Sequence, residues 1–126
     1  MANARLLVVD DNPNERDMMQ RRLGKLGYEV AVAEGGEQAL TMIAAIPYDL
    51  VILDVTMPDI DGMEVLRRLR MTHSAEQLPV IMVTASLAVA TQVMAGELGA
   101  NHFIVKPVII EMAERWIEKL VNRRAA

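Results

Sequence analysis

The chain of 126 residues is 52% hydrophobic and 24% charged, a composition that predicts one globular domain with a core of its own. It contains no cysteine, which excludes disulfides, thiolate metal sites and cysteine nucleophiles; this fits a reducing compartment, and we expect a cytoplasmic protein. The net charge of −4 gives no basic surface for nucleic acid, and the first residues do not have the form of a signal peptide.

The N-terminal half alternates apolar strands with amphipathic helices. Asn12 and Pro13 suit the start of the first helix, Gly27 ends it, and Pro47 ends the second. In chain order, the predicted elements are a strand over 6–9, a helix over 13–26, a strand over 28–32, a helix over 39–46 and a strand over 49–54. The last of these strands is an unbroken apolar run that ends on Asp54, which is typical of a strand buried on both faces.

The C-terminal half continues the same alternation. Its predicted elements are a helix over 63–69, a strand over 79–83, a helix over 88–98, a strand over 102–105 and a helix over 109–123. Five β-α units in succession predict an α/β fold of the flavodoxin-like (βα)5 type. We expect a doubly wound, five-stranded parallel sheet of order 2-1-3-4-5, with helices on both faces and right-handed crossovers.

One segment, 77–96, has no charged residue and is long enough to cross a bilayer. It contains Pro79 and several polar residues, and it divides into a strand, a polar turn and a helix, so we expect no membrane span. The two histidines, His73 and His102, form no metal-site pattern, and we expect both at the surface.

Polar residues fall where four of the predicted strands end. Asp10 and Asp11 follow the first strand, Asp54 ends the third, Thr84 follows the fourth and Lys106 follows the fifth. These ends lie at one edge of a parallel sheet, and the strand order reverses between strands one and three, where the three carboxylates should meet. Taken singly, the residues are ordinary helix caps, a turn residue and a solvated lysine. Their joint placement favours one site.

Three close carboxylates repel one another unless a cation compensates their charge. Carboxylate oxygens suit Mg²⁺ or Mn²⁺. Together with the ammonium group of Lys106 and the hydroxyl of Thr84, they predict a site for a phosphoryl group, with an aspartate as its acceptor.

The ordered motifs resemble the receiver domain of two-component response regulators, the CheY-like family. The matching stretches span essentially the whole chain: Val8–Asp11, Asp54 with Met57–Asp59 and Asp61–Gly62, Pro79–Ile81, Val83–Ala85, Gly99–Ala100 and Val105–Pro107. The resemblance implies a phosphorylation-dependent signalling switch that receives its phosphoryl group from a histidine kinase or a histidine phosphotransfer protein. It implies no enzyme beyond self-phosphorylation from small phosphodonors and self-dephosphorylation.

The resemblance also implies a role for each position of the site. Asp54 matches the phosphoacceptor. The Mg²⁺ ligands of the family match Asp10, Asp11, Asp54 and the backbone carbonyl of Thr56. The contacts to the phosphoryl oxygens match Thr84 and Lys106, and the switch aromatic that follows Thr84 matches Phe103. Thr56 and Ser86 match positions that modulate the lifetime of the phosphoryl group. The Lys106–Pro107 bond matches one that is usually cis.

The surface expected to report phosphorylation comprises the fourth helix, the fifth strand and the fifth helix. The helix over 88–98 has no charge between Leu87 and Gly96 and includes poor helix formers, so we expect it to be locally unstable and easily moved. A second apolar stripe on the last helix, together with the fourth helix, forms a candidate surface for a homodimer or a downstream protein: Val89, Ala90, Met94, Ile109, Met112 and Trp116. The alternative is that these residues form the rim of the core.

Two other functions stay open. A Mg²⁺-dependent phosphatase with an aspartyl nucleophile would use similar carboxylates, but it usually needs an acid/base aspartate two residues after the nucleophile, where this chain has Thr56. A degenerate receiver would act only as a binding module, although the acidic set is complete here. We expect residues 1–126 to form one receiver domain with no output domain.

Overall fold

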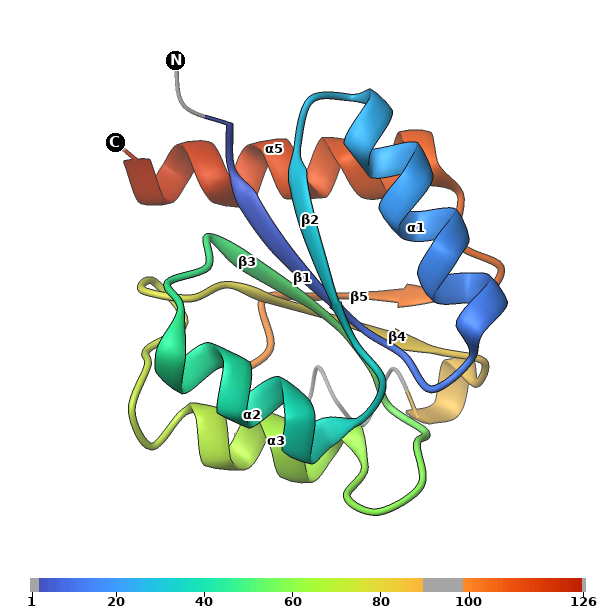
Figure 1. The fold of residues 1–126 in the computed structure, drawn as a ribbon, viewed down its shortest axis with the longest axis vertical. Coiled ribbons are helices and arrows are strands. Elements are labelled where there is room, and N and C mark those ends of the chain that lie inside the picture. The colour runs from blue at the N-terminus through green and yellow to red at the C-terminus, as the bar shows by residue number, and fades with distance from the viewer. Residues whose placement is uncertain (1–2, 90–98, 126) are drawn as a thin grey trace.

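The structure is a computed structural model that describes residues 3–89 and 99–125 (Figure 1). Five strands form one parallel sheet in the order β2-β1-β3-β4-β5, which confirms the predicted topology. The strands are β1 (Arg5–Val9), β2 (Glu29–Ala33), β3 (Leu50–Asp54), β4 (Val80–Thr84) and β5 (His102–Val105). Their carboxyl ends therefore lie at one edge of the sheet.

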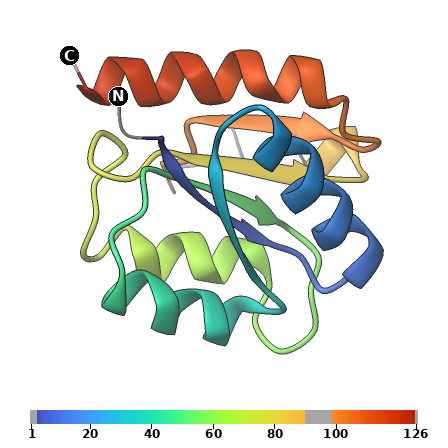
Figure 2. The same cartoon turned by 45° about the horizontal axis from the view of Figure 1, so that its top comes forward.

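Helices cover both faces of the sheet. They are α1 (Pro13–Lys25), α2 (Gly36–Ala45), α3 (Gly62–Leu69) and α5 (Ile110–Ala125). Figures 1 and 2 show α1 and α5 on one face and α2 and α3 on the other. Residues 87–89 are helical, but the rest of the helix predicted over 88–98, with Ala90 and Met94, lies outside the described residues.

The core is divided into two clusters by the sheet. Along β3, Leu50 and Ile52 pack with α1 and α5, while Val51 and Leu53 pack with α2 and α3. All five residues of β3 are buried, as its apolar run predicted. Asp54 thus ends a strand that both helical layers fix in place.

Two of the helices begin at side chains that cap them. The Oδ1 atom of Asn12 accepts hydrogen bonds from the backbone N–H groups of Asn14 and Glu15, at 2.9 and 3.3 Å, and Pro13 occupies the first turn of α1. Asp61 caps α3 by accepting from the N–H of Glu64 at 2.9 Å. Both caps lie in loops that follow carboxyl ends of strands, so they orient the first turns of α1 and α3 toward the same edge of the sheet.

Across the described parts of the chain, no helix combines the length and the apolar character needed to span a bilayer. Within the uncharged segment 77–96, Val80–Thr84 form β4, whose five residues are all buried. Over β4, this stretch lacks charged residues because its side chains are buried inside the sheet.

Candidate functional site

The predicted polar residues gather at the carboxyl edge of the sheet. Asp10, Asp54 and Thr84 follow or end β1, β3 and β4, and they are 8%, 5% and 3% exposed. Lys106 follows β5, and its backbone N–H donates to the carbonyl of Thr84 at 2.8 Å. Four strands therefore hold one small group of buried or half-buried polar side chains.

Gly62 fixes the loop that follows Asp54. A Cβ atom at this position would collide with the backbone carbonyl of Asp54, so only glycine allows the start of α3 to approach the strand end so closely. The N–H of Gly62 also donates to the carbonyl of Val55 at 2.8 Å. The match of Asp61–Gly62 to the family motif thus has a steric reason in this chain.

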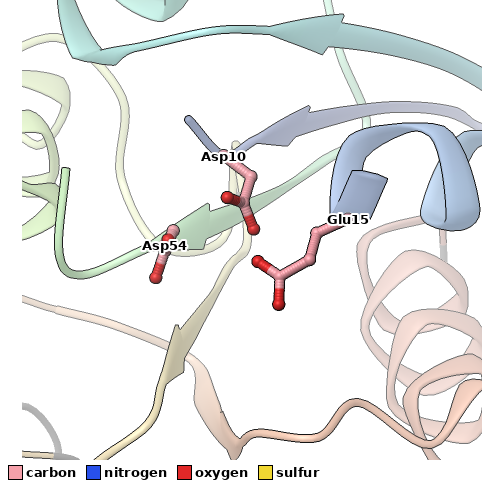
Figure 3. Close-up of side chains that lie close together, drawn as sticks. All are labelled: Asp10, Glu15 and Asp54. Atoms are coloured by element: carbon pink, nitrogen blue, oxygen red, sulfur yellow. The ribbon is translucent and has the colours of Figure 1, made fainter. Parts of the chain in front are cut away.

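Lys106 is surrounded by carboxylates at unequal distances. Its Nζ atom lies 2.8 Å from Oε2 of Glu15, 3.5 Å from Oδ2 of Asp54 and 3.7 Å from Oδ2 of Asp10. Figure 3 shows the three carboxylates arriving from β1, β3 and α1 around one small space. One oxygen from each lies within 4.8 Å of the others.

Glu15 is the site residue that the sequence reasoning missed. It lies in the first turn of α1, immediately after the Asn12 cap. The sequence did offer one signal for it: Glu15 is an acidic residue in the first turn of a helix that begins just after two adjacent aspartates. Whether such a residue turns toward the site depends on the rotation of α1 about its axis, which sequence does not reveal.

Burial opposes the negative charge at this edge. It raises the pKa of Asp10 to about 7, and Glu15 and Asp54 add to the increase, while the N–H of Asn12 and the charge of Lys106 offset part of it. Burial likewise raises the pKa of Asp54, against the opposing effect of Lys106. A bound cation would relieve both carboxylates.

The Lys106 and Glu15 pair behaves differently. The hydrogen bond from Lys106 lowers the pKa of Glu15. Burial by itself would lower the pKa of Lys106, but the bond to Glu15 and the fields of Asp54 and Asp10 outweigh burial and raise it. Lys106 is therefore held in its charged form.

Asp11 and Thr56 have a more open position than the three clustered carboxylates. Both are exposed, and both line an open cavity of about 510 Å³ whose wall also includes Glu15, Asp54 and Lys106. Asp11 is not one of the three residues whose oxygens lie within 4.8 Å of one another. The cavity thus brings Asp11, Asp54, Thr56 and Lys106 to one solvent-accessible opening, whereas Asp10 and Thr84 are not among its lining residues.

Thr84 leads from the site toward the segment after β4. Its Oγ1 atom accepts from the N–H of Ser86 at 3.1 Å, and Oγ of Ser86 accepts from the N–H of Val89 at 3.3 Å. Phe103 is half-buried and packs against the core cluster that includes α2 and α3. A change at Thr84 would therefore be felt where the helix predicted over 88–98 begins.

The candidate partner surface is divided by the structure. Ile109 and Met112 are 52% and 58% exposed, whereas Val89 and Trp116 are half-buried and pack against the core. His102, expected at the surface, is half-buried and stacks on Trp116 with ring centroids 3.7 Å apart. The rim interpretation thus fits Val89 and Trp116, and the surface interpretation fits Ile109 and Met112.

The family model for the response regulator receiver domain matches residues 6–117. The chain belongs to this family. The receiver is 40% identical over 119 residues to the probable transcriptional regulator ycf27 of Cyanophora paradoxa, which covers 94% of this chain and 48% of that protein. It is also 40% identical over 121 residues to the response regulator MprA of Mycobacterium bovis, which covers 96% of this chain and 52% of that protein. The chain spans about half the length of these curated relatives.

Solved receiver structures agree with the fold. The response regulator TrrA of Thermotoga maritima, in complex with Mg²⁺-BeF, is 35% identical with a TM-score of 0.83, and the match covers 93% of this chain and 98% of that one. The chemotaxis protein CheY4 of Vibrio cholerae is 31% identical with a TM-score of 0.84, and the match covers 94% and 99%. The predicted flavodoxin-like fold and the predicted family are both confirmed.

Proposed function

We propose that this receiver accepts a phosphoryl group on Asp54 from a histidine kinase or a histidine phosphotransfer protein in the cytoplasm. The observation that carries the proposal is the position of Asp54. It ends a buried strand, faces an open cavity, and lies 3.5 Å from the one ammonium group in a cluster of carboxylates. This arrangement presents a nucleophilic oxygen beside a fixed positive charge.

The carboxylates fit a divalent cation. Asp10 and Asp54 offer hard oxygen donors within a few ångströms of each other. Their raised pKa values reflect, first of all, the cost of burying negative charge, which a cation would offset. We propose Asp10, Asp11, Asp54 and the backbone carbonyl of Thr56 as ligands of Mg²⁺, with Mn²⁺ as a chemically similar substitute. When bound, the cation supplies positive charge beside the phosphoryl oxygens.

The transfer itself is a displacement at phosphorus. A carboxylate oxygen of Asp54 forms the new O–P bond, and the bond between phosphorus and the donor breaks, its electron pair leaving with the imidazole of the donor histidine. Lys106 and the Thr84 hydroxyl would then contact the phosphoryl oxygens. Attack of water on phosphorus later returns the aspartate and releases inorganic phosphate.

The hydrogen bonds formed on phosphorylation supply about enough free energy to reverse a two-state equilibrium, with little surplus. A charge-assisted hydrogen bond contributes about 1.5–3 kcal/mol. Two of them, from Thr84 and Lys106, give roughly 3–6 kcal/mol, while reversing a 1:99 equilibrium needs about 5.5 kcal/mol. We propose that Thr84 moves toward the phosphoryl group, that Phe103 follows, and that the surface carrying Ile109 and Met112 reports the change to a partner.

The proposal is tested by incubating the receiver with a small phosphodonor and measuring its intact mass. We expect a phosphoryl adduct with Mg²⁺ and none with a chelator. If no adduct formed under either condition, the proposal would be wrong, and the result would favour a degenerate receiver that acts only as a binding module. Continuous turnover of an external phosphate ester would instead favour the phosphatase, against which Thr56, standing where an acid/base aspartate would be, already argues.

A further inference from the structure

Glu15 makes the shortest contact to Lys106. Its Oε2 atom lies 2.8 Å from Nζ, which is the distance of a charge-assisted hydrogen bond. The corresponding distances to Asp54 and Asp10 are 3.5 and 3.7 Å, which correspond to longer ion pairs. In the unphosphorylated receiver, the strongest interaction of the lysine is therefore with a residue outside the proposed phosphoacceptor and metal set.

The backbones on both sides of this contact are fixed. The N–H of Glu15 donates to the Asn12 cap at the start of α1. The N–H of Lys106 donates to the carbonyl of Thr84 at the end of β4. Rotation of the two side chains is therefore enough for Lys106 to exchange Glu15 for another partner, without movement of α1 or β5.

A phosphoryl group on Asp54 would compete with Glu15 for the same ammonium. Phosphorylation adds about 1.5 to 2 negative charges near pH 7, in a site where one lysine already faces three carboxylates. To contact the new oxygens, Nζ must weaken or give up its bond to Glu15. The Glu15 carboxylate also repels the incoming anion. Retention of Lys106 and repulsion of the phosphoryl group therefore both disfavour the phosphorylated state.

We propose that Glu15 is a positioning residue that holds Lys106 away from the phosphoryl site and so lowers the affinity of the receiver for the phosphoryl group. This latch rests on the proposed function of Asp54 and Lys106 and deepens it. Removal of the Glu15 charge should release Lys106 and favour the phosphorylated state. Because the pair is partly exposed, with side-chain exposures of 23% and 36%, the effect should be moderate.

The test compares Glu15→Gln with the unaltered receiver in a titration with beryllofluoride, a phosphoryl mimic, at saturating Mg²⁺. We expect the variant to bind beryllofluoride about three- to tenfold more tightly. Asp17→Asn is the matched control, because it removes one negative charge from the same helix at a residue paired with Arg21. The control should bind with the affinity of the unaltered receiver. Glu15→Asp keeps the charge on a shorter side chain and should give an intermediate affinity.

A second readout needs neither metal nor phosphoryl mimic. In the metal-free receiver, the ammonium protons of Lys106 should be protected from exchange with water, as seen by NMR, and Glu15→Gln should remove that protection.

The outcomes separate the latch from the proposed function. Equal or weaker beryllofluoride binding by Glu15→Gln, with normal binding by the unaltered receiver, overturns the latch alone. Equal tightening in Glu15→Gln and Asp17→Asn would indicate a general charge effect and also overturns the latch. Failure of the unaltered receiver to bind beryllofluoride would overturn the proposed function and the latch with it.

Discussion

At the scale of single residues, the site is defined by carboxylates that the fold buries and cannot neutralise by itself. Asp10 and Asp54 come from the ends of two adjacent strands, and Lys106 lies nearer to Glu15 than to either. The residual negative charge is the physical reason to expect a cation. It also makes the affinity for that cation dependent on pH.

Mg²⁺ affinity should rise with pH. Because the pKa of Asp10 is raised to about 7, a proton competes with the cation below that pH. Affinity should therefore increase about fivefold from pH 6 to 7 and about twofold from pH 7 to 8. A titration of the receiver with Mg²⁺ at pH 6, 7 and 8 measures this. Equal affinities at the three pH values would show that protonation of Asp10 does not compete with Mg²⁺.

The same carboxylate links folding to pH in the opposite direction. Between the ordinary pKa of 3.8 and about 7, the folded chain binds more protons at Asp10 than the unfolded chain does. In metal-free receiver, this residue should therefore lower the free energy of unfolding as pH rises through that window. Denaturant titrations should show that decrease, and Asp10→Asn should reduce it. A decrease of the same size in the variant would show that another group is responsible.

At the scale of the elements, the close approach of α3 to the end of β3 keeps the site in shape. Gly62→Ala would place a methyl group against the carbonyl of Asp54, so we expect a loss of about 1–3 kcal/mol in the free energy of unfolding. Gly24→Ala is the control, since a Cβ there meets nothing within 4 Å and α1 should gain about 0.5–1 kcal/mol. Denaturant unfolding measures both, and a neutral Gly62→Ala would show that the approach is not restrictive.

Arg70, the residue that caps the C-terminal end of α3, forms hydrogen bonds at the edge of the sheet where β4 and β5 begin, opposite the site. Its guanidinium donates to the carbonyls of Leu78 and Gly99 at 2.9 Å and to Oδ1 of Asn101 at 3.1 Å, so α3 is tied to the residues on both sides of the segment 80–98. Lysine cannot reproduce this fork. Arg70→Lys should cost about 2–3 kcal/mol in unfolding free energy. The exposed Arg67→Lys is the comparison, and equal stabilities for the two variants would argue against a special role of Arg70.

The elements also show what sequence could and could not predict. The strands and the place of Asp54 at a strand end were predictable, because buried apolar runs and alternating periodicity depend on local sequence. The strand order followed from the order that five successive β-α units commonly adopt. The turn of Glu15 toward Lys106 and the stack of His102 on Trp116 were not, because they depend on how α1 and α5 dock on the sheet. Contacts between elements distant in sequence have no local signature.

At the scale of the whole molecule, the site and the candidate partner surface lie on connected elements. Lys106 follows β5, and Ile109 and Met112 are exposed where α5 begins. We expect beryllofluoride with Mg²⁺ to promote self-association, and the double variant Ile109→Ser/Met112→Ser to reduce it. Met71→Ser is the control, because Met71 is another exposed methionine, in the turn after α3. Sedimentation that shows a monomer in every condition would argue against a dimer through this surface.

Transfer of a phosphoryl group to Asp54 can be measured by the intact mass of the receiver after incubation with a small phosphodonor and Mg²⁺. Asp54→Asn removes the proposed nucleophile, while Asp49→Asn changes an aspartate just before the amino end of the same strand. We expect a phosphoryl adduct on the unaltered receiver and on Asp49→Asn, and none on Asp54→Asn. A stable adduct on Asp54→Asn would show that Asp54 is not the phosphoacceptor.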